Sequence, residues 1–148
     1  DDFHYNAVDK ADWKAQKMID GKKAIAIGVW CMDGAHWYRS EIHPVFGLAI
    51  QTEDVSSGTP GQEVWQFFIR NRGNQNWCGE QIKVKDPIPD WYFRFPGQPK
   101  AVDAKVVYLK NNKTVKCKLL KKGNDILLRM HLPGKKYWAA GTITIIWK

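Results

Sequence analysis

Four polar residues within one stretch of the chain, two histidines and two acids, have the types and spacing of a reactive site. They are Asp33, His36, Glu41 and His43, which fall in the stretch WCMDGAHWYRSEIHPV over residues 30–45. Imidazole and carboxylate groups together bind first-row divalent metals, and two histidines with one carboxylate form the ligand set of open catalytic sites. We therefore expect His36, His43 and Glu41 to hold a divalent transition metal such as Zn, Mn, Fe or Cu.

The two acids of this cluster are candidates for catalytic roles, because a bound metal activates water or oxygen. Glu41 is either the third metal ligand or the general base, and Asp33 is either a ligand or the group that orients a histidine. Two other interpretations stay open: a solvated hydrogen-bonding pair beside a turn at Gly34, and acid–base or ligand-binding chemistry without a metal. The spacing H-x4-E-x-H is neither HExxH nor a paired CxxC.

A β-hairpin must position this cluster. The apolar run 24–31 predicts one strand, Gly34 marks the turn, and residues 41–51 predict the next strand. Because side chains alternate along a strand, Glu41 and His43 would project from the same face, roughly 6.5–7 Å apart, with the two loop residues of the cluster folded back over them. The residues expected to anchor the opposite face are Ile42, Phe46, Leu48 and Ile50.

Arg129 and His131 are further candidates for ligand binding. They lie in a predicted strand over 125–132, on the parity opposite to its apolar residues. If this face meets the face of Glu41 and His43, His131 supplies a third imidazole and Arg129 an anion-binding group. If it does not, both are ordinary surface residues.

Eight tryptophans in 148 residues are unusual, and the aromatic residues divide into two groups. The group with the strand parity of a core is Trp65, Phe67, Phe93 and Trp147. The other group lies in or near loops, where flat rings either stack on sugar rings or close the ends of a sandwich. Its members are Trp37, Tyr38, Trp77, Trp91, Tyr92, Tyr137 and Trp138. The predicted ligand-binding set is Trp37, Tyr38, Arg39, Arg129, His131 and Trp138.

Short strands separated by turn signals fill most of the chain, which favours an all-β fold. We predict a single domain over 1–148, an antiparallel β-sandwich or jelly-roll-like barrel, with a mobile segment at 1–8 and one short helix at 9–20. The run 24–31 is expected to be covered on both faces, and 116–121, which alternates Lys with apolar residues, to form an exposed edge or outer face. The expected strands are 24–31, 41–51, 63–70, 81–85, 91–95, 104–110, 114–121, 125–132 and 141–147, with a turn at 86–90 (DPIPD).

The chain carries 23 Lys and Arg against 15 Asp and Glu, a formal net charge of +8. This balance favours an acidic partner such as an acidic polysaccharide, nucleic acid or anionic lipid, or else a solvated lysine-rich surface. The residues expected to bind an acidic polymer are Lys116, Lys118, Lys121 and Lys122. Nucleic acid has no specific support, since the sequence has no RGG stretch and no RNA-recognition aromatic signature. No apolar run approaches the ~20 residues that a membrane-spanning helix needs.

The three cysteines, Cys31, Cys78 and Cys117, leave at least one thiol unpaired in a monomer. Cys117 has the parity of a core thiol, so a disulfide, if one exists, is expected between Cys31 and Cys78. A glycosylation sequon at 112–114 and a start at Asp1 without Met favour a secreted or periplasmic protein.

We therefore expect an exported metal-binding β domain, a metal-dependent hydrolase or oxidase that acts on an extracellular polymer such as a polysaccharide. One alternative is a non-catalytic carbohydrate-binding module that uses loop aromatics, and another is a basic module that binds an acidic polymer. Enzymes that use a glycine-rich phosphate loop or a G-x-S-x-G nucleophile find no support, because the chain has neither motif.

Overall fold

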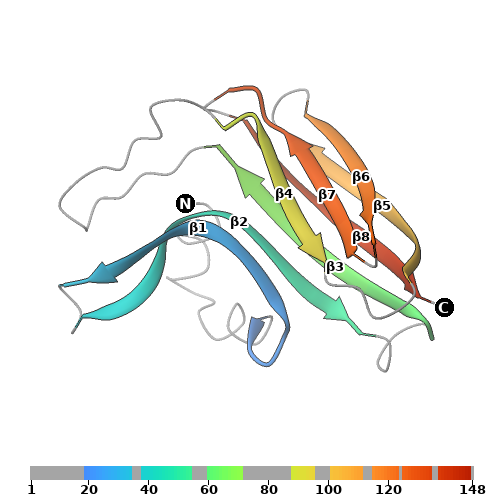
Figure 1. Ribbon diagram of the computed structural model, residues 1–148, viewed down its shortest axis with the longest axis horizontal. Coiled ribbons are helices and arrows are strands. Elements are labelled where there is room, and N and C mark those ends of the chain that lie inside the picture. Colours follow the sequence, from blue (N-terminus) through green and yellow to red (C-terminus); the bar gives the residue numbers. More distant parts are fainter. Residues whose placement is uncertain are drawn as a thin grey trace.

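Two antiparallel sheets, of five and three strands, make up the fold in a sandwich-like arrangement (Figure 1). The computed structural model describes residues 19–34, 38–54, 60–71, 88–95, 101–111, 115–123, 125–134 and 137–147. The strands are β1 (Ala24–Asp33), β2 (Arg39–Glu53), β3 (Gln62–Arg70), β4 (Asp90–Phe95), β5 (Ala101–Asn111), β6 (Lys116–Lys122), β7 (Asp125–His131) and β8 (Trp138–Trp147). The larger sheet has the order β1-β2-β3-β8-β5 and the smaller sheet the order β4-β7-β6.

These eight strands confirm the all-β prediction and eight of the nine predicted strands. The predicted strand at 81–85 and the segment 1–8 lie outside the described residues, as does the predicted helix at 9–20 except for Ile19 and Asp20. Within the part of the chain that is described, no helix has the length and hydropathy to cross a bilayer.

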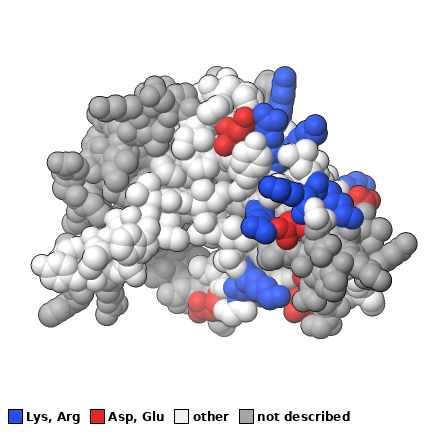
Figure 2. All heavy atoms as spheres, in the orientation of Figure 1, with Lys and Arg blue, Asp and Glu red and all other residues white. Residues whose placement is uncertain are grey.

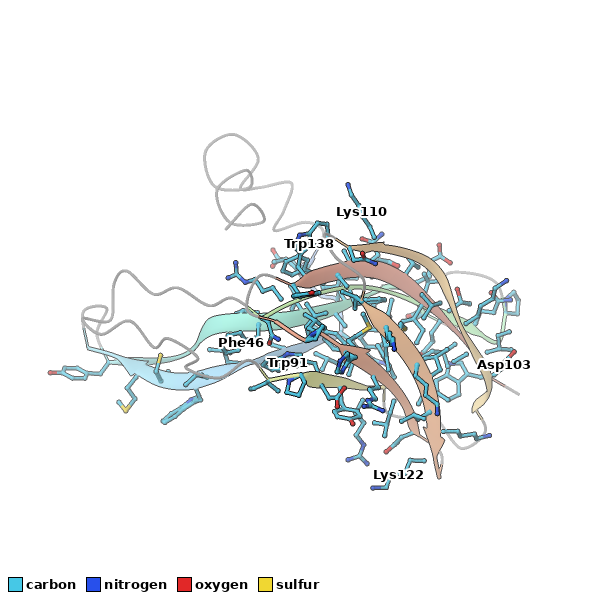
Figure 3. The ribbon with its side chains drawn as sticks, turned by 90° about the horizontal axis from the view of Figure 1, so that it is seen from above. Phe46, Trp91, Asp103, Lys110, Lys122 and Trp138 are labelled. Carbon is cyan, nitrogen blue, oxygen red and sulfur yellow. The ribbon has the colours of Figure 1, made fainter. Side chains whose placement is uncertain are left out.

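The core lies between the two sheets and is built by alternation along the strands. In β7, Ile126, Leu128 and Met130 are buried, whereas the residues between them are half-exposed. The predicted core aromatics are confirmed, since Trp65, Phe67, Phe93 and Trp147 are all buried. Contacts across the sandwich join the layers: the Phe46 and Trp91 rings, seen between the sheets in Figure 3, have centroids 5.2 Å apart.

A buried asparagine connects the ends of four strands. Asn71, directly after β3, is only 2 % exposed, and its Nδ2 donates to the carbonyl oxygens of Ile88 at 2.9 Å and Leu132 at 2.7 Å. Its Oδ1 accepts a hydrogen bond of 2.7 Å from the indole Nε1 of Trp91, and its backbone N–H donates to the Tyr137 carbonyl at 2.9 Å. Because every polar atom of this side chain is paired, the buried amide costs little and fixes how the two sheets meet.

The predicted parity of β2 is confirmed at Phe46, which is buried in the core, but it is wrong for the residues that follow. Gly47 and Ala49 face the smaller sheet, and Ala49 belongs to the core cluster, whereas Ile50 is buried without belonging to it. A Cβ added at Gly47 would lie 3.0 Å from the ring of Phe93 and 3.1 Å from Ile69. The side chains of Phe93 and Ile69 fill the space beside Gly47, so this inward position of β2 must be small. A prediction from hydrophobicity alone places the larger residues, Leu48 and Ile50, on the inward face.

The prediction that β1 is covered on both faces is also wrong. Ile25, Ile27 and Val29 pack against the core, but the alternate residues of the strand are exposed, and Trp30 has 66 % of its surface accessible. The reason is position: β1 is an edge strand of the larger sheet, and the smaller sheet covers only one side of that sheet.

The far halves of β1 and β2 form an arm that extends beyond the sandwich (Figure 1). β2 pairs with β3 only from Gly47 to Glu53, so among the described strands the ladder between 28 and 45 consists of β1 and β2. We call residues 28–45 the arm. Large apolar side chains of the arm, including Met32 and Ile42, are exposed, and its charged residues Asp33, Arg39 and Glu41 are described by their backbone alone.

Candidate functional site

The hairpin predicted to carry the metal site is confirmed, but Asp33, which was predicted to lie in the loop, is the last residue of β1 instead. The four key side chains are not among those described. Asp33 pairs with Arg39 and Cys31 pairs with Glu41, so the backbone places Asp33 and Glu41 at diagonal positions of one ladder. His36 lies outside the described residues, and of Asp33, Glu41 and His43 only the backbone is described. The metal centre therefore stays a prediction.

A register shift occurs next to one of these residues. Gly28 pairs with Val45 and Trp30 with Ile42, so two steps along β1 correspond to three along β2. His43 and Pro44 of β2 therefore lie opposite a single residue of β1, Val29. Proline has no N–H to donate, and a bulge in a part of β2 that does not pair with β3 is where a strand accepts it. Simple alternation therefore ends at His43.

Among the side chains that the structure does describe, no group of three or more His, Cys, Asp and Glu is placed to hold a metal ion. The strongest polar constellation in this part of the chain lies elsewhere, on the outer face of the smaller sheet.

We call this surface the basic face. The registers of β4, β7 and β6 align its side chains in rows, the first being Asp90, His131 and Lys116 and the second Tyr92, Arg129 and Lys118. The remaining members are Arg94, Leu127, Leu120, Asp125 and Lys122. Five Lys or Arg stand against two Asp, and Figure 2 shows blue side chains gathered where these strands lie, while the described surface of the arm is white. The result is a local excess of positive charge.

Asp90 organises the centre of the basic face. Its carboxylate accepts two hydrogen bonds from Arg129, Nε to Oδ1 at 3.0 Å and Nη2 to Oδ2 at 2.9 Å. The same Oδ1 lies 2.9 Å from Nδ1 of His131. The hydrogen bond from Arg129 and then the contact with His131 hold the pKa of the Asp90 carboxyl below its ordinary value. The guanidinium in turn has a raised pKa because of Asp90, so Arg129 is held charged and fixed in direction.

The lysines of β6 complete the face as cations that are available to a ligand. Lys116, Lys118 and Lys122 are exposed and make no ion pair with any side chain in the described ranges. This confirms the prediction that the alternating Lys segment forms an exposed edge, because β6 is an edge strand of the smaller sheet. Adjacent strands are separated by about 4.8 Å and alternate residues by about 6.6 Å, so the cations form a two-dimensional array rather than one point charge.

A shallow hollow of about 430 Å³ opens at this edge, lined by Lys116, Cys117, Lys118, Arg129 and His131. Cys117 is half-buried against the core, as its parity predicts, and burial raises the pKa of its thiol. A thiol held in its protonated form is a packing residue and not an activated nucleophile. The chemistry that the hollow supports is therefore the binding of an anion.

The predicted ligand-binding residues are divided among three parts of the molecule. Arg129 and His131 meet on the basic face, on β7, whereas Glu41 and His43 belong to β2 of the other sheet. Trp138 stacks on Phe68 with centroids 6.4 Å apart, and in Figure 3 it lies on the opposite side of the molecule from Lys122. Tyr38 is 74 % exposed at the end of the arm, and Trp37 and the side chain of Arg39 lie outside the description.

The aromatics near loop ends differ in exposure. Trp91 is buried with its indole N–H bound to Asn71, so it belongs to the core. Tyr92, the next residue of β4, is 48 % exposed at the centre of the basic face. Tyr38 has φ 54°, a left-handed backbone conformation that is uncommon for a residue other than glycine. Of these aromatics, Tyr92 alone lies beside the cations.

Sequence reasoning missed Asp90 because it ends the DPIPD stretch, which indicates a turn. Its role depends on the pairing of Asp90 in β4 with His131 in β7, which lies 41 residues later in the chain. The sequence does contain one signal for this site: an acid, Asp90, begins a strand in which aromatic residues follow.

Replacing Asp90 by Asn is expected to destabilise the protein at neutral pH and to have a smaller effect in acid. A carboxyl whose pKa is lowered by folding stabilises the folded state above its unfolded pKa, near 3.8, and this contribution is lost as the pH falls through the lower pKa of the folded state. Urea unfolding of both proteins across this range measures the difference. Glu53→Gln, which removes an exposed acid at the end of β2, is the control. A difference that does not change with pH would contradict the assignment.

Comparison with known proteins gives no relative from which a function can be transferred, because no family model, no curated protein and no solved structure matches this chain.

Proposed function

We propose that this chain is a binding module for an anionic polysaccharide, which it holds on the basic face. The observation that carries the proposal is the array of exposed lysines on β6 beside an arginine that Asp90 fixes in place. An extracellular location, where such polymers occur, is part of the same proposal.

The arrangement of charge favours a polymer over a small anion. The cations extend over all three strands of the smaller sheet, and the hollow at the edge of β6 is shallow and open to solvent. A small anion is held by convergent groups in an enclosed pocket, whereas a chain with repeated charges gains from several separate contacts. The open outer face of a sheet suits the second case.

The aromatic content of the face favours sugar over nucleic acid. Proteins that bind single-stranded nucleic acid stack successive bases on several aromatic rings. On the described surface of the smaller sheet, Tyr92 is the one exposed aromatic, and it lies in the same row as Arg129 and Lys118. One ring beside several cations suits a single sugar ring whose neighbours carry sulfate or carboxylate groups.

The experiment is a binding panel at several salt concentrations. The purified chain is titrated with heparin, with neutral dextran and with single-stranded DNA that carries the same number of charges as the heparin. We expect heparin to bind and dextran not to bind, with the affinity for heparin falling by about tenfold or more between about 50 and 200 mM NaCl as screening and counterion release take effect. Binding of dextran equal to that of heparin, or a clear preference for DNA, would contradict the proposal.

A metal centre on the arm is a second proposal, and with it the metal-dependent hydrolase or oxidase activity. It is favoured by the diagonal placement of Asp33 and Glu41 in the hairpin ladder. Zn, Mn, Fe and Cu contents of protein purified without added metal should be stoichiometric for one of them and fall to background in a His36→Ala, His43→Ala variant. Equal metal content in the two proteins, or none in either, would remove this proposal.

The jelly-roll form of the fold and the helix at 9–20 likewise remain proposals.

A further inference from the structure

The free edges of the two sheets differ in their charge. Among the strands described, β5, β4 and β6 are the other edges, and each carries charged residues: Asp103, Lys105 and Lys110 on β5, Asp90 and Arg94 on β4, and the lysines of β6. The edge strand β1 has no charged residue and no proline from Ala24 to Met32. Charges and prolines protect an edge strand from pairing with another chain, so β1 is the unprotected edge.

The exposed side of β1 is graded in size along the strand. Its residues are Ala24, Ala26, Gly28, Trp30 and Met32, small at one end and large at the other, and all are exposed. Trp30 and Met32 leave 66 % and 58 % of their surfaces accessible. Such large exposed apolar residues on an unpaired edge mark a surface that a partner covers.

Two copies of β1 in antiparallel orientation are complementary in the size of these side chains. In an antiparallel pair of two β1 strands centred on Gly28, each Trp30 lies opposite Ala26 and each Met32 lies opposite Ala24. On the inner side, Ile27 lies opposite Val29, which continues the apolar row that packs against each core. Large residues thus meet small ones in both halves of the pair, as a twofold symmetric interface requires.

We propose that a second copy of this chain pairs with β1, so that two larger sheets join edge to edge into one continuous sheet around a twofold axis at Gly28. The partner is a copy of the same chain because β1 from Ala24 to Met32 is complementary in size to its own reverse and carries no charge. The interface is on the larger sheet and leaves the basic face of each protomer open. The proposals of a dimer and of polysaccharide binding can therefore be tested independently of each other.

Sedimentation of the full chain over a range of concentrations tests the proposal. We expect a reversible monomer–dimer equilibrium that Ala26→Lys weakens by about tenfold or more, because the lysine would be buried against Trp30 of the other copy. Gln66→Lys is the matched control: it places the same charge on an exposed residue of the central strand β3 and should leave the equilibrium unchanged. The proposal would be overturned by a chain that stays monomeric at the highest concentration, or by a dimer that Ala26→Lys does not affect. A monomeric chain would overturn it even if β1 binds a different partner.

Cross-linking tests the register. Among the described glycines φ is positive at Gly21, Gly61 and Gly123 but not at Gly28, so a cysteine fits the backbone there. Gly28→Cys should form a disulfide-linked dimer on mild oxidation, since residue 28 faces itself across the axis. Ala24→Cys keeps the same native cysteines but faces Met32 of the partner, and it should cross-link no more than the unmodified chain. Equal cross-linking of the two variants would contradict the register.

Discussion

Exchanging Asn71 for Asp is expected to lower the free energy of unfolding by about 3 kcal/mol or more. The amide Nδ2 donates to the carbonyl oxygens of Ile88 and Leu132, and no atom of a carboxylate can replace both bonds. Two buried carbonyls would lose their donor, at about 1–3 kcal/mol each, and a carboxylate oxygen would face them. The bond from the Trp91 indole to the Asn71 side chain would survive, so the loss reports on the two donated bonds and on the burial of a charge at this position.

Urea unfolding at neutral pH measures this effect, with Asn111→Asp as the control. Asn111 ends β5 and is exposed, so the same chemical change there should alter stability by no more than about 0.5 kcal/mol. Because Asn71 connects the ends of β3, β4, β7 and β8, its loss should also make the smaller sheet exchange its amide protons faster. Equal effects of the two substitutions would show that the amide does not join the sheets as described.

Reversing two charges on the basic face should remove most of the affinity for an anionic polysaccharide. In the double variant Lys116→Glu, Lys118→Glu, two exposed cations of β6 become anions beside the hollow. An exposed ion pair contributes up to about 1 kcal/mol, and reversal replaces attraction by repulsion, so the dissociation constant for heparin should rise by about 30-fold or more.

The matched control is Lys105→Glu, Lys110→Glu on β5. Both lysines are exposed on the larger sheet, and Figure 3 shows Lys110 on the side of the molecule opposite Lys122. The control changes the net charge by the same amount, so it should alter heparin affinity by only a few-fold through the overall field. Calorimetry with both variants separates a local site from a general charge effect, and equal losses in the two variants would indicate the general effect.

Strand positions were predictable from the sequence because alternation and turn residues are local signals. In β7, the buried Ile126, Leu128 and Met130 follow the period of two that the sequence shows, and the alternating lysines of β6 correctly indicate an exposed strand. The sequence does not show which strands lie side by side in a sheet. That is why the sequence does not indicate that Gly47 and Ala49 face the smaller sheet, since their small size has meaning only beside Phe93.

The candidate site was predictable only in part for the same reason. Arg129, His131 and the lysines of β6 were identified singly, from charge and parity, but their assembly depends on the order β4-β7-β6. Asp90 escaped because its partners come from a strand that is distant in the chain. The edge position of β1, which leaves Trp30 exposed, also follows from sheet order and not from the apolar run itself.

Amide chemical shifts of the ¹⁵N-labelled chain during a titration with a short heparin oligosaccharide test the basic face most directly. We predict that the shifts concentrate on residues 116–122 of β6 and 129–131 of β7 and saturate together, with little change at Phe68 and Trp138 on the other side of the molecule. Shifts centred on Trp138 or on the arm, or the absence of any shift at low salt, would contradict the account.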